Sequence, residues 1–470
     1  MIRRSLFLLC CTLGWPLAAH AQTAALDSVD RWVRAEAARQ RIPGLSLAVL
    51  RGDSLLLARG YGEANVEHHV PATDSTVYQS GSVGKQFTAA CVMLLVEEGK
   101  LALDDPITRH VPELPASWRT ITVRHLLSHT SGIPDYADST LDYRRDYAED
   151  DLVRLAASLT RAFAPGESWS YSNTGYILLG ILIRRVTGRF YGDFLIERVF
   201  APLGMGDTRI ISEADIVFRR ADGYRLVDGA LQHQSWVSPS LNTTADGSLY
   251  LTVHDLARWA VNLNHPRVPA PASLEASWTP IRLNGGGTYG YGFGWALQPQ
   301  RGYRRIGHGG SWQGFRATVQ RYPDFGITVI VLANLAQARV EAMAAQVAGI
   351  LEPALTPPHA LTAPLPGPPP AVAVREAARR AIVERDTTLL TPGYARFVLG
   401  QQDEGAGAMF AAVTDWVPLG CDELGARGFE RLGAMVERVC YARAAFPLGR
   451  VLFEVLYAGG RVADIAPYTF

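Results

Sequence analysis

A serine and a lysine three residues apart, Ser82 and Lys85, are the side chains whose types and spacing first suggest chemistry. They lead into an apolar run over residues 89–98, which predicts a helix with both side chains near its start. Side chains at this spacing share a helix face, where a neutral amine can accept the proton of a hydroxyl group. The helix dipole also favours negative charge at Ser82. The pair fits nucleophilic catalysis, although the motif alone is weak because both residue types are common.

Tyr171 and Asn173 form a second candidate pair. A phenolate stabilised by Lys85 could act as general base toward Ser82 or toward a deacylating water. The ordinary pKa of a phenol, ~10, is too high for this role unless a cation lies nearby. Taken alone, Tyr171 is more simply explained as a half-buried aromatic residue. Asn173 favours the catalytic interpretation, because its amide would orient Lys85 and a substrate amide.

A third candidate segment is His308, Gly309 and Gly310, which precedes strand-like residues 315–322. With an ordinary pKa of ~6.5, a histidine is mostly neutral at neutral pH. His308 would therefore hold a substrate carboxylate less well than a lysine would. We expect anionic substrates to be handled better as the pH falls toward the pKa of His308.

These segments resemble those of a known group of enzymes. Residues 81–88, Gly-Ser-Val-Gly-Lys-Gln-Phe-Thr, resemble the nucleophile segment of class C β-lactamases and D,D-peptidases. Residues 171–173 are similar to the Tyr-x-Asn element, residues 308–310 to the Lys/His-x-Gly strand, and residues 126–132 to the Leu-Leu-Ser-His-Thr-Ser-Gly segment. Their order and spacing agree with the family over residues 25–351, and a chance coincidence of all four is improbable. The chain thus resembles the penicillin-recognising serine hydrolases.

The resemblance implies an α/β (α+β) fold of the β-lactamase and transpeptidase type, with an antiparallel sheet flanked by helices and an all-helical insertion. It also implies an acyl-enzyme on Ser82, formed without metal or cofactor. Backbone N–H groups of Ser82 and Ser311 would form the oxyanion hole, which usually contributes most to such acyl transfers. Gly310, Ser311 and Arg316 would bind the substrate.

Two departures from the β-lactamase pattern affect the expected substrate. His308 stands where most β-lactamases have a lysine, and Gly309 replaces the usual hydroxyl residue. Ser311 or Arg316 could compensate for the lost carboxylate recognition. We therefore expect hydrolysis of an amide, a D-amino-acid peptide or an ester. The alternatives are a β-lactamase proper and a non-catalytic binding or sensing protein that retains the fold.

Two further features lie near these segments. His129 could suggest a Ser-His pair with Ser131 or Ser82, but a structural role is favoured because the chain contains no Gly-x-Ser-x-Gly elbow. Residues 289–295 alternate aromatic residues with glycine at the period of a strand. They either line the cleft or pack one face of a sheet, and the sequence does not decide between these.

After the signal peptide, the sequence predicts three parts: a hydrolase domain over residues 22–352, a Pro-rich linker over residues 353–373, and a small α+β module of unknown role over residues 374–470. Predicted helices cover residues 27–41, 151–163, 176–187, 335–351 and 374–385. Predicted strands cover residues 45–50, 54–60, 304–307, 315–322, 326–333, 437–446, 451–457 and 461–466.

Composition and the first residues bear on partners and compartment. Lys plus Arg and Asp plus Glu both number 45, with no basic stripe, so nucleic-acid binding is set aside. Arg3 and Arg4 precede an apolar run over residues 6–17, which predicts a signal peptide over residues 1–21 and an exported, periplasmic or secreted protein without stable membrane insertion after cleavage. An uncleaved membrane anchor is the alternative. The partner would be a small-molecule or peptide substrate, and the oligomeric state stays open.

The cysteines and the adjacent histidines have simpler interpretations. Cys421 and Cys440 could pair in an oxidising compartment, whereas Cys91 lies in an apolar helical run and is expected in the core. His68 and His69 would point to opposite faces of a strand and are expected at the surface. None of these residues has the spacing of a metal site.

Overall fold

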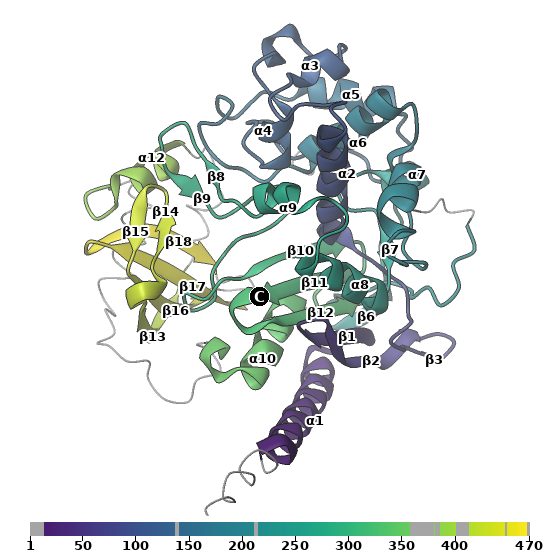
Figure 1. Cartoon of the computed structure of the whole chain (residues 1–470), viewed down its shortest axis with the longest axis vertical. Coiled ribbons are helices and arrows are strands. Elements are labelled where there is room, and N and C mark those ends of the chain that lie inside the picture. Colours follow the sequence, from purple (N-terminus) through teal and green to yellow (C-terminus); the bar gives the residue numbers. More distant parts are fainter. Residues whose placement is uncertain are drawn as a thin grey trace, which may run out of the picture.

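The computed structural model describes residues 14–136, 141–210, 215–357, 380, 386–400, 413–446 and 449–467. Its centre is a six-stranded antiparallel sheet (Figure 1) with strand order β10-β11-β12-β1-β2-β3. The strands are β1 (Gly44–Arg51), β2 (Ser54–Asn65), β3 (Val70–Pro71), β10 (Ile306–Trp312), β11 (Phe315–Tyr322) and β12 (Ile327–Ala333). The family-type fold expected from the sequence is confirmed, with helices on both faces of the sheet.

Both faces of the central strands are buried, which explains why these strands are apolar without interruption. In β1, Leu45, Leu47 and Val49 belong to the core on one face of the sheet. Ala48 and Leu50 belong to the core on the other face. Alternation of side chains along a strand separates the two cores. The sheet is therefore the inner layer of a sandwich.

One face of the sheet is covered by two terminal helices, α1 (Gly14–Gln40) and α10 (Val340–Leu351). In α1, Val29, Val33 and Ala37 recur at intervals of four and are buried on the core side. The N-terminal end of α1 extends away from the body of the molecule in Figure 1. None of the helices within the described residues is both long and apolar enough to cross a bilayer. Residues 1–13 of the predicted signal peptide lie outside the described residues.

The other face carries the helical insertion. Its elements are η1 (Gly81–Gly84), α2 (Lys85–Glu97), α3 (Ile107–His110), η2 (Ala116–Trp118), α4 (Val123–Leu127), α5 (Glu149–Ser158), α6 (Asn173–Thr187), α7 (Tyr191–Leu195), η4 (Ile196–Phe200), η5 (Pro239–Thr243), α8 (Val253–Asn264) and α9 (Pro271–Ser277). Short ribbons join them: β4 (Tyr78–Gln79) with β7 (Tyr250–Leu251), β5 (Tyr224–Val227) with β6 (Ala230–His233), and β8 (Ile281–Arg282) with β9 (Thr288–Tyr289). Helix α2 is buried from Lys85 through Leu95, which is the expected state of a helix that is apolar on every side. Lys85 thus starts a core helix.

Several predicted boundaries were wrong, and a local interaction explains one of them. Helix α6 begins at Asn173 because Ser172 caps it, its Oγ accepting a hydrogen bond from the Gly175 N–H. Strand β10 begins at Ile306, not at residue 304, and continues to Trp312, so the His-Gly-Gly segment lies on a strand as the resemblance implies. Helix α5 ends at Ser158 rather than at residue 163, and α10 begins at Val340 rather than at residue 335.

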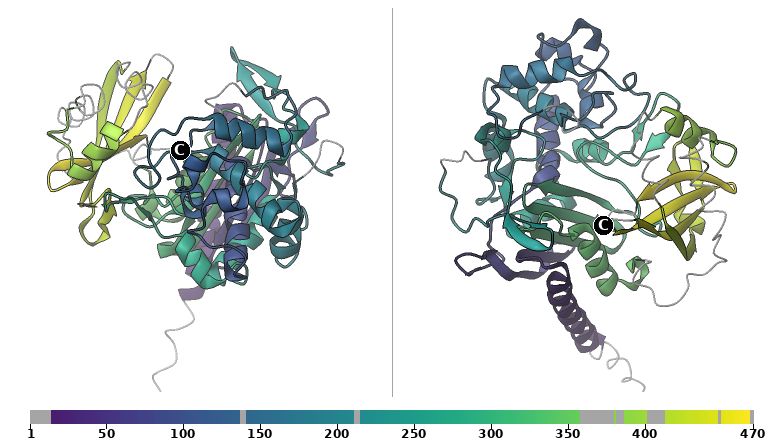
Figure 2. Two further views of the ribbon diagram at one scale, coloured as in Figure 1. Left: turned by 90° about the horizontal axis from the view of Figure 1, so that it is seen from above. Right: turned by 180° about the vertical axis from the view of Figure 1, so that it is seen from behind.

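The C-terminal module is a four-stranded antiparallel sheet with order β13-β16-β17-β18, a β14–β15 hairpin and a helix. Its elements are α12 (Pro392–Gly400), β13 (Asp415–Glu423), η9 (Gly425–Arg427), β14 (Phe429–Arg431), β15 (Ala434–Val436), β16 (Arg438–Phe446), β17 (Gly449–Ala458) and β18 (Arg461–Pro467). The consecutive strands β16, β17 and β18 form the predicted meander. Strand β13 was not predicted. Figure 2 shows the module beside the hydrolase domain.

Most of the predicted linker, and the helix predicted over residues 374–385 apart from Arg380, lie outside the described residues. The first linker residues are packed against the hydrolase domain. Pro353–Leu355 (η7) form a turn in which Leu355 is buried. The Gln300 side-chain amide donates a hydrogen bond to the Leu355 carbonyl oxygen at 2.5 Å.

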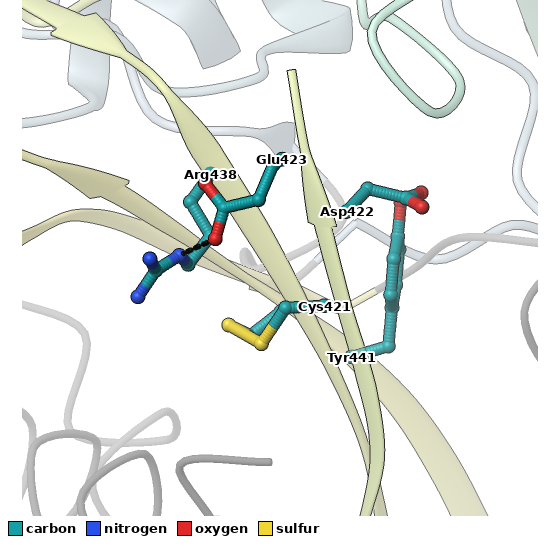
Figure 3. Close-up of a disulfide and its surroundings, with 6 residues drawn as sticks. Cys421, Asp422, Glu423, Arg438 and Tyr441 are labelled. Carbon is teal, nitrogen blue, oxygen red and sulfur yellow. Dashed lines mark hydrogen bonds and ion pairs between the residues drawn. A yellow bond between two sulfur atoms is a disulfide. The ribbon is translucent and has the colours of Figure 1, made fainter. Parts of the chain in front are cut away.

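Cys421 and Cys440 form a disulfide between the paired strands β13 and β16, whereas Cys91 is a buried free thiol. Figure 3 shows the disulfide beside Asp422, which accepts a hydrogen bond from the Tyr441 hydroxyl at 3.0 Å. Asp422 also forms a two-point ion pair with Arg301 of the hydrolase domain, both N–O distances being 2.9 Å. The disulfide strand therefore also contacts the hydrolase domain through this ion pair.

The paired variant Cys421→Ser/Cys440→Ser should lower the free energy of unfolding of the module by about 3 kcal/mol, because it frees a loop of this size in the unfolded chain. Urea unfolding followed by circular dichroism measures the loss. A reductant should give the same loss in the unmodified protein and none in the paired variant. Cys91→Ala is the matched control, and an equal effect there would contradict the assignment.

Candidate active site

The candidate nucleophile lies on a tight turn against the edge strand of the main sheet. Ser82 belongs to η1 and is half-buried, and Gly81 before it has φ +49°. A Cβ atom on Gly81 would lie 2.4 Å from the Ser311 backbone nitrogen on β10. Glycine is required here both by the positive φ and by the close approach of the two backbones. The turn fixes Ser82 beside β10.

The amine of Lys85 reaches the Ser82 hydroxyl. The distance from Lys85 Nζ to Ser82 Oγ is 3.1 Å, and Nζ also donates to Asn173 Oδ1 at 2.6 Å and to the Asp246 carbonyl oxygen at 2.5 Å. The Lys85 side chain is fully buried. Three oxygen atoms therefore surround a buried amine, and one of them is the candidate nucleophile.

Burial changes the ionisation of this amine. Desolvation lowers the pKa of Lys85 to about 8, against the opposing charges of Asp246 and Asp135. A substantial fraction of the amine is then neutral near pH 8 and can accept a proton. The expected partnership of Ser82 and Lys85 is present in the geometry.

Tyr171 lies next to this pair, with Lys85 Nζ 5.0 Å from the centre of its ring. Its hydroxyl oxygen is buried and makes no hydrogen bond of good geometry, although the Ser82 hydroxyl is near enough to lower the pKa of Tyr171. Burial is the stronger influence and raises this pKa well above 10. The phenolate expected from the sequence is therefore disfavoured, and the phenol stays protonated.

Asn173 is held by a residue that the motif analysis did not identify. The Asp135 carboxylate accepts hydrogen bonds from the Asn173 backbone N–H at 3.0 Å and from its side-chain amide at 2.8 Å. This leaves Asn173 Oδ1 directed at Lys85. Asp246, also not identified, contributes its carbonyl oxygen to Lys85 and accepts a hydrogen bond from Tyr136 at 2.9 Å. No spacing or motif in the sequence marks either aspartate.

The two backbone N–H groups expected for an oxyanion hole lie close together. A Cβ atom on Gly310 would lie 2.0 Å from the Ser80 carbonyl oxygen and 3.1 Å from the Ser82 nitrogen. Gly81 makes the matching approach to Ser311. The strand and the nucleophile turn thus meet backbone to backbone, and Gly310 acts by its small size rather than through a side chain.

His308 lies at the site as part of a chain of hydrogen bonds. His129 Nδ1 accepts from the Ser172 backbone N–H at 3.1 Å, so its Nε2 carries the proton and donates to the Tyr291 hydroxyl at 3.2 Å. Tyr291 in turn donates to His308 Nε2 at 2.9 Å, and His308 Nδ1 donates to the Gly309 carbonyl oxygen at 2.6 Å. Every hydrogen-bonding atom of this chain has a partner when both imidazoles are neutral.

The ionisation of His308 differs from the expectation. Burial, together with the charge of Lys85, lowers the pKa of His308 to about 4, although the bond to Gly309 opposes this. Burial also holds the pKa of His129 well below 6.5. His308 is therefore neutral at neutral pH and both of its ring nitrogens are engaged. It is a poor candidate for holding a substrate carboxylate.

The surroundings of Gly309, and of Ser311 and Arg316 that were expected to compensate for it, bear on carboxylate recognition. A Cβ atom at Gly309 would lie 2.1 Å from Glu341 Oε1 of α10, so this carboxylate occupies the space that a hydroxyl residue would need. Arg316 donates from Nε to the Ala336 carbonyl oxygen at 2.6 Å. Its partner in the sheet register is Ser311, which is exposed. The prediction that Arg316 binds the substrate gains no support, because its guanidinium is bound elsewhere.

The aromatic run divides into two parts. Tyr291 contacts His129 and His308 at the site, and Tyr289 stacks on Trp169 with ring centres 4.3 Å apart. Phe293 and Trp295 are buried in the large core. The run therefore contributes two tyrosines to the surroundings of the site and two aromatic residues to the core. The expected structural role of His129 also agrees with its contacts, since it bonds neither Ser82 nor Ser131.

Two further features bear on the extent of the site, the arrangement of candidate metal ligands and one large groove. Among the described residues, no group of three or more His, Cys, Asp or Glu side chains is arranged to hold a metal ion. His68 and His69 are exposed, and His69 contacts Glu63. A groove of about 1240 Å³, lined partly by Trp278 and Phe293, includes none of the candidate catalytic residues. The candidate site is therefore defined by the contacts of its side chains, and this groove lies elsewhere.

The sequence relatives agree with this geometry. The beta-lactamase family model matches residues 29–352. Penicillin-binding protein 4* from Bacillus subtilis is 33% identical over 314 residues, which cover 63% of this chain and 69% of the relative. Two further relatives are matched over 62% and 63% of their own length, so the chain spans less than two thirds of them.

Solved structures extend the comparison. D-amino acid amidase from Ochrobactrum anthropi, complexed with L-phenylalanine amide, has a TM-score of 0.61 and 26% identity over 71% of this chain and 99% of its own. The octameric penicillin-binding protein homologue from Pyrococcus abyssi has a TM-score of 0.64 and 24% identity over 95% of this chain and 96% of its own, which shows a shared fold. With the family model matching most of its length, the chain belongs to the beta-lactamase family of penicillin-recognising serine hydrolases.

Proposed function

We propose that the protein is an exported serine hydrolase that cleaves an amide, a D-amino-acid peptide or an ester through an acyl-enzyme on Ser82. The observation that carries this proposal is the buried Lys85 amine, 3.1 Å from the Ser82 hydroxyl, with a pKa of about 8. A serine needs a base to become a nucleophile, and a desolvated lysine supplies one. The retention of Ser82, Lys85, Tyr171 and Asn173 together argues against a non-catalytic binding or sensing protein.

In the first half of the reaction, neutral Lys85 takes the Ser82 proton while Oγ attacks the carbonyl carbon of the substrate. The backbone N–H groups of Ser82 and Ser311 stabilise the negative charge on the substrate oxygen. Tyr171, still protonated and with Lys85 Nζ 5.0 Å from its ring centre, would pass a proton from Lys85 to the leaving nitrogen or oxygen. The bond to the leaving group breaks, and the acyl group remains on Ser82.

In the second half, a water molecule attacks the acyl group while Lys85 accepts its proton. The proton returns to Ser82 Oγ as the ester bond breaks, which releases the acid and restores the free enzyme. The oxygen of the Asn173 side chain points toward Lys85, and its NH2 group is fixed by Asp135. Asn173 and the Asp246 carbonyl oxygen therefore hold Lys85 in both halves, while the Ser82 oxygen changes between hydroxyl and ester.

The substrate class follows from the neutral His308. A β-lactamase in which a cation holds the substrate carboxylate is less well supported, since the site offers a neutral imidazole and a glycine in this region. The structural similarity to a D-amino acid amidase supports amide or peptide hydrolysis. A β-lactamase proper remains the second candidate through the family match alone.

Export is supported by the predicted signal peptide together with the disulfide. Disulfides persist in oxidising compartments and are uncommon in the cytosol. The Cys421–Cys440 disulfide therefore fits a periplasmic or secreted protein. Cys91, the free cysteine among the described residues, is buried.

Intact-mass spectrometry after treatment with a fluorophosphonate tests the nucleophile. We expect one adduct on Ser82, because Lys85 activates only this hydroxyl. Ser82→Ala should abolish the adduct, and Lys85→Ala should lower its rate of formation by about 10³-fold. An adduct that persists in Ser82→Ala would overturn the proposal. Turnover of D-amino-acid amides, p-nitrophenyl esters and nitrocefin then ranks the substrate classes.

The pH dependence of labelling tests Lys85 and its neighbours. Since only the neutral amine accepts a proton, the labelling rate should rise with pH and level off above the Lys85 pKa of about 8. The charge of Asp135 raises this pKa, so Asp135→Asn should move the midpoint to lower pH. It should also lower the plateau rate by about tenfold, because Asn173 loses its anchor. Asp150→Asn, exposed on α5, is the control, and a shared midpoint in both variants would exclude the role of Asp135.

The Michaelis constant for a carboxylate-bearing substrate tests His308. Because His308 is protonated only below its pKa of about 4, this constant should stay flat between about pH 5.5 and pH 8. The earlier expectation from an ordinary histidine is the opposite, a constant that falls through ~6.5 as the pH is lowered. Steady-state kinetics at several pH values decides between them, and a falling constant would show that His308 titrates against the substrate.

A further inference from the structure

A row of aromatic rings leads from the site into the C-terminal module. Trp169 lies 6.5 Å from Tyr171 between ring centres and stacks on Tyr289 at 4.3 Å. Tyr289, on β9, stacks in turn on Phe397 of α12 at 5.7 Å. The row therefore starts beside the candidate general acid and ends in the module.

Arg431 of the module fixes the middle of this row. Its guanidinium carbon lies 4.0 Å from the centre of the Tyr289 ring, and it is almost fully buried. Asp464 of β18, also buried, accepts a hydrogen bond from Arg431 Nε at 2.6 Å. A desolvated cation against an aromatic face is a strong and directional contact. The ion pair holds the guanidinium in one position over Tyr289.

The backbones of the two parts are also joined at this point. The Leu432 N–H donates to the Thr288 carbonyl oxygen at 2.9 Å, and the Thr288 N–H donates to Glu430 Oε1 at 3.1 Å. A Cβ atom on Gly287 would lie 2.5 Å from the Leu432 carbonyl carbon. The β14–β15 hairpin thus lies directly on β9, as the labels in Figure 1 also show.

Trp169 connects this support to the chemistry. Besides Tyr171, its ring contacts His129 at 6.0 Å and Tyr291 at 5.7 Å between ring centres. His129 in turn lies 4.3 Å from Tyr171. A shift of Trp169 would therefore disturb the Tyr171 ring and the two residues, His129 and Tyr291, that lead by hydrogen bonds to His308.

We propose that the C-terminal module completes the active-site wall, with Arg431, held by Asp464, acting as a positioning residue for Tyr171 through Tyr289 and Trp169. The inference rests on the proposed function. Arg431 touches neither Ser82 nor Lys85. It would instead affect proton transfer through the position of the Tyr171 ring. Loss of this support should lower kcat and leave KM nearly unchanged, because the oxyanion hole and β10 are untouched.

The test uses the full chain and removes both charges at once, in Arg431→Met/Asp464→Asn, so that no charge is left buried and unpaired. A second variant, Tyr289→Leu, removes the ring, whereas Tyr289→Phe keeps it. We expect the first two variants to lower both kcat on a p-nitrophenyl ester and the rate of Ser82 labelling by at least about tenfold, with KM within about threefold. Tyr289→Phe, which keeps the ring, should retain the kcat and the labelling rate of the unmodified protein.

A matched control is the Arg301–Asp422 ion pair, in which Arg301 is half-buried and Asp422 is buried, removed in Arg301→Met/Asp422→Asn. This pair also joins the module to the hydrolase domain but contacts neither Tyr289 nor Trp169 in any described interaction. Its removal should cost a similar drop in thermal midpoint and leave kcat within about threefold. Equal loss of kcat in both paired variants, or none in either, would overturn the role of Arg431. Absence of any Ser82 adduct in the unmodified protein would instead overturn the proposed function.

Discussion

The constraint on which the active site depends is the burial of one amine. Helix α2 is apolar on every side and lies in the core, so its first residue, Lys85, is taken out of water with it. An ammonium group in such a place is stable only with compensating oxygens, and Ser82, Asn173 and Asp246 provide them. The remaining cost of desolvation lowers the pKa of Lys85 to about 8. The packing of α2 in the core thereby makes the Lys85 amine a base near neutral pH.

The neighbours of Lys85 are neutral for the same reason. Its charge contributes to the low pKa values of His129 and His308, and burial keeps Tyr171 as a phenol. A second cation in this space would be repelled, and the hydrogen bonds through Tyr291 satisfy both imidazoles without one. The site therefore has one titrating amine among neutral donors and acceptors. This arrangement suits proton transfer better than the capture of an anion.

Among the contacts that join the C-terminal module to the hydrolase domain, two have different consequences. Arg301 and Asp422 tie the disulfide strand to the loop before β10. Arg431 instead reaches the aromatic row that ends at Tyr171. The first contact holds the module in place, whereas the second couples its position to the wall of the site. A module without catalytic residues of its own can act on catalysis in this way.

The sequence by itself determined what depends on neighbouring residues. The spacing of Ser82 and Lys85 sets a local helix geometry, the alternation in β1 separates two cores, and the last strands pair with their neighbours as a meander. Tertiary structure decided the rest, because the partners are far apart in the chain. Lys85 meets Asn173 across 88 positions and Asp246 across 161, and no local pattern marks Asp135 as the anchor. The ionisation of His308 and the direction of Arg316 depend on burial and on contacts from other elements, which residue types alone do not fix.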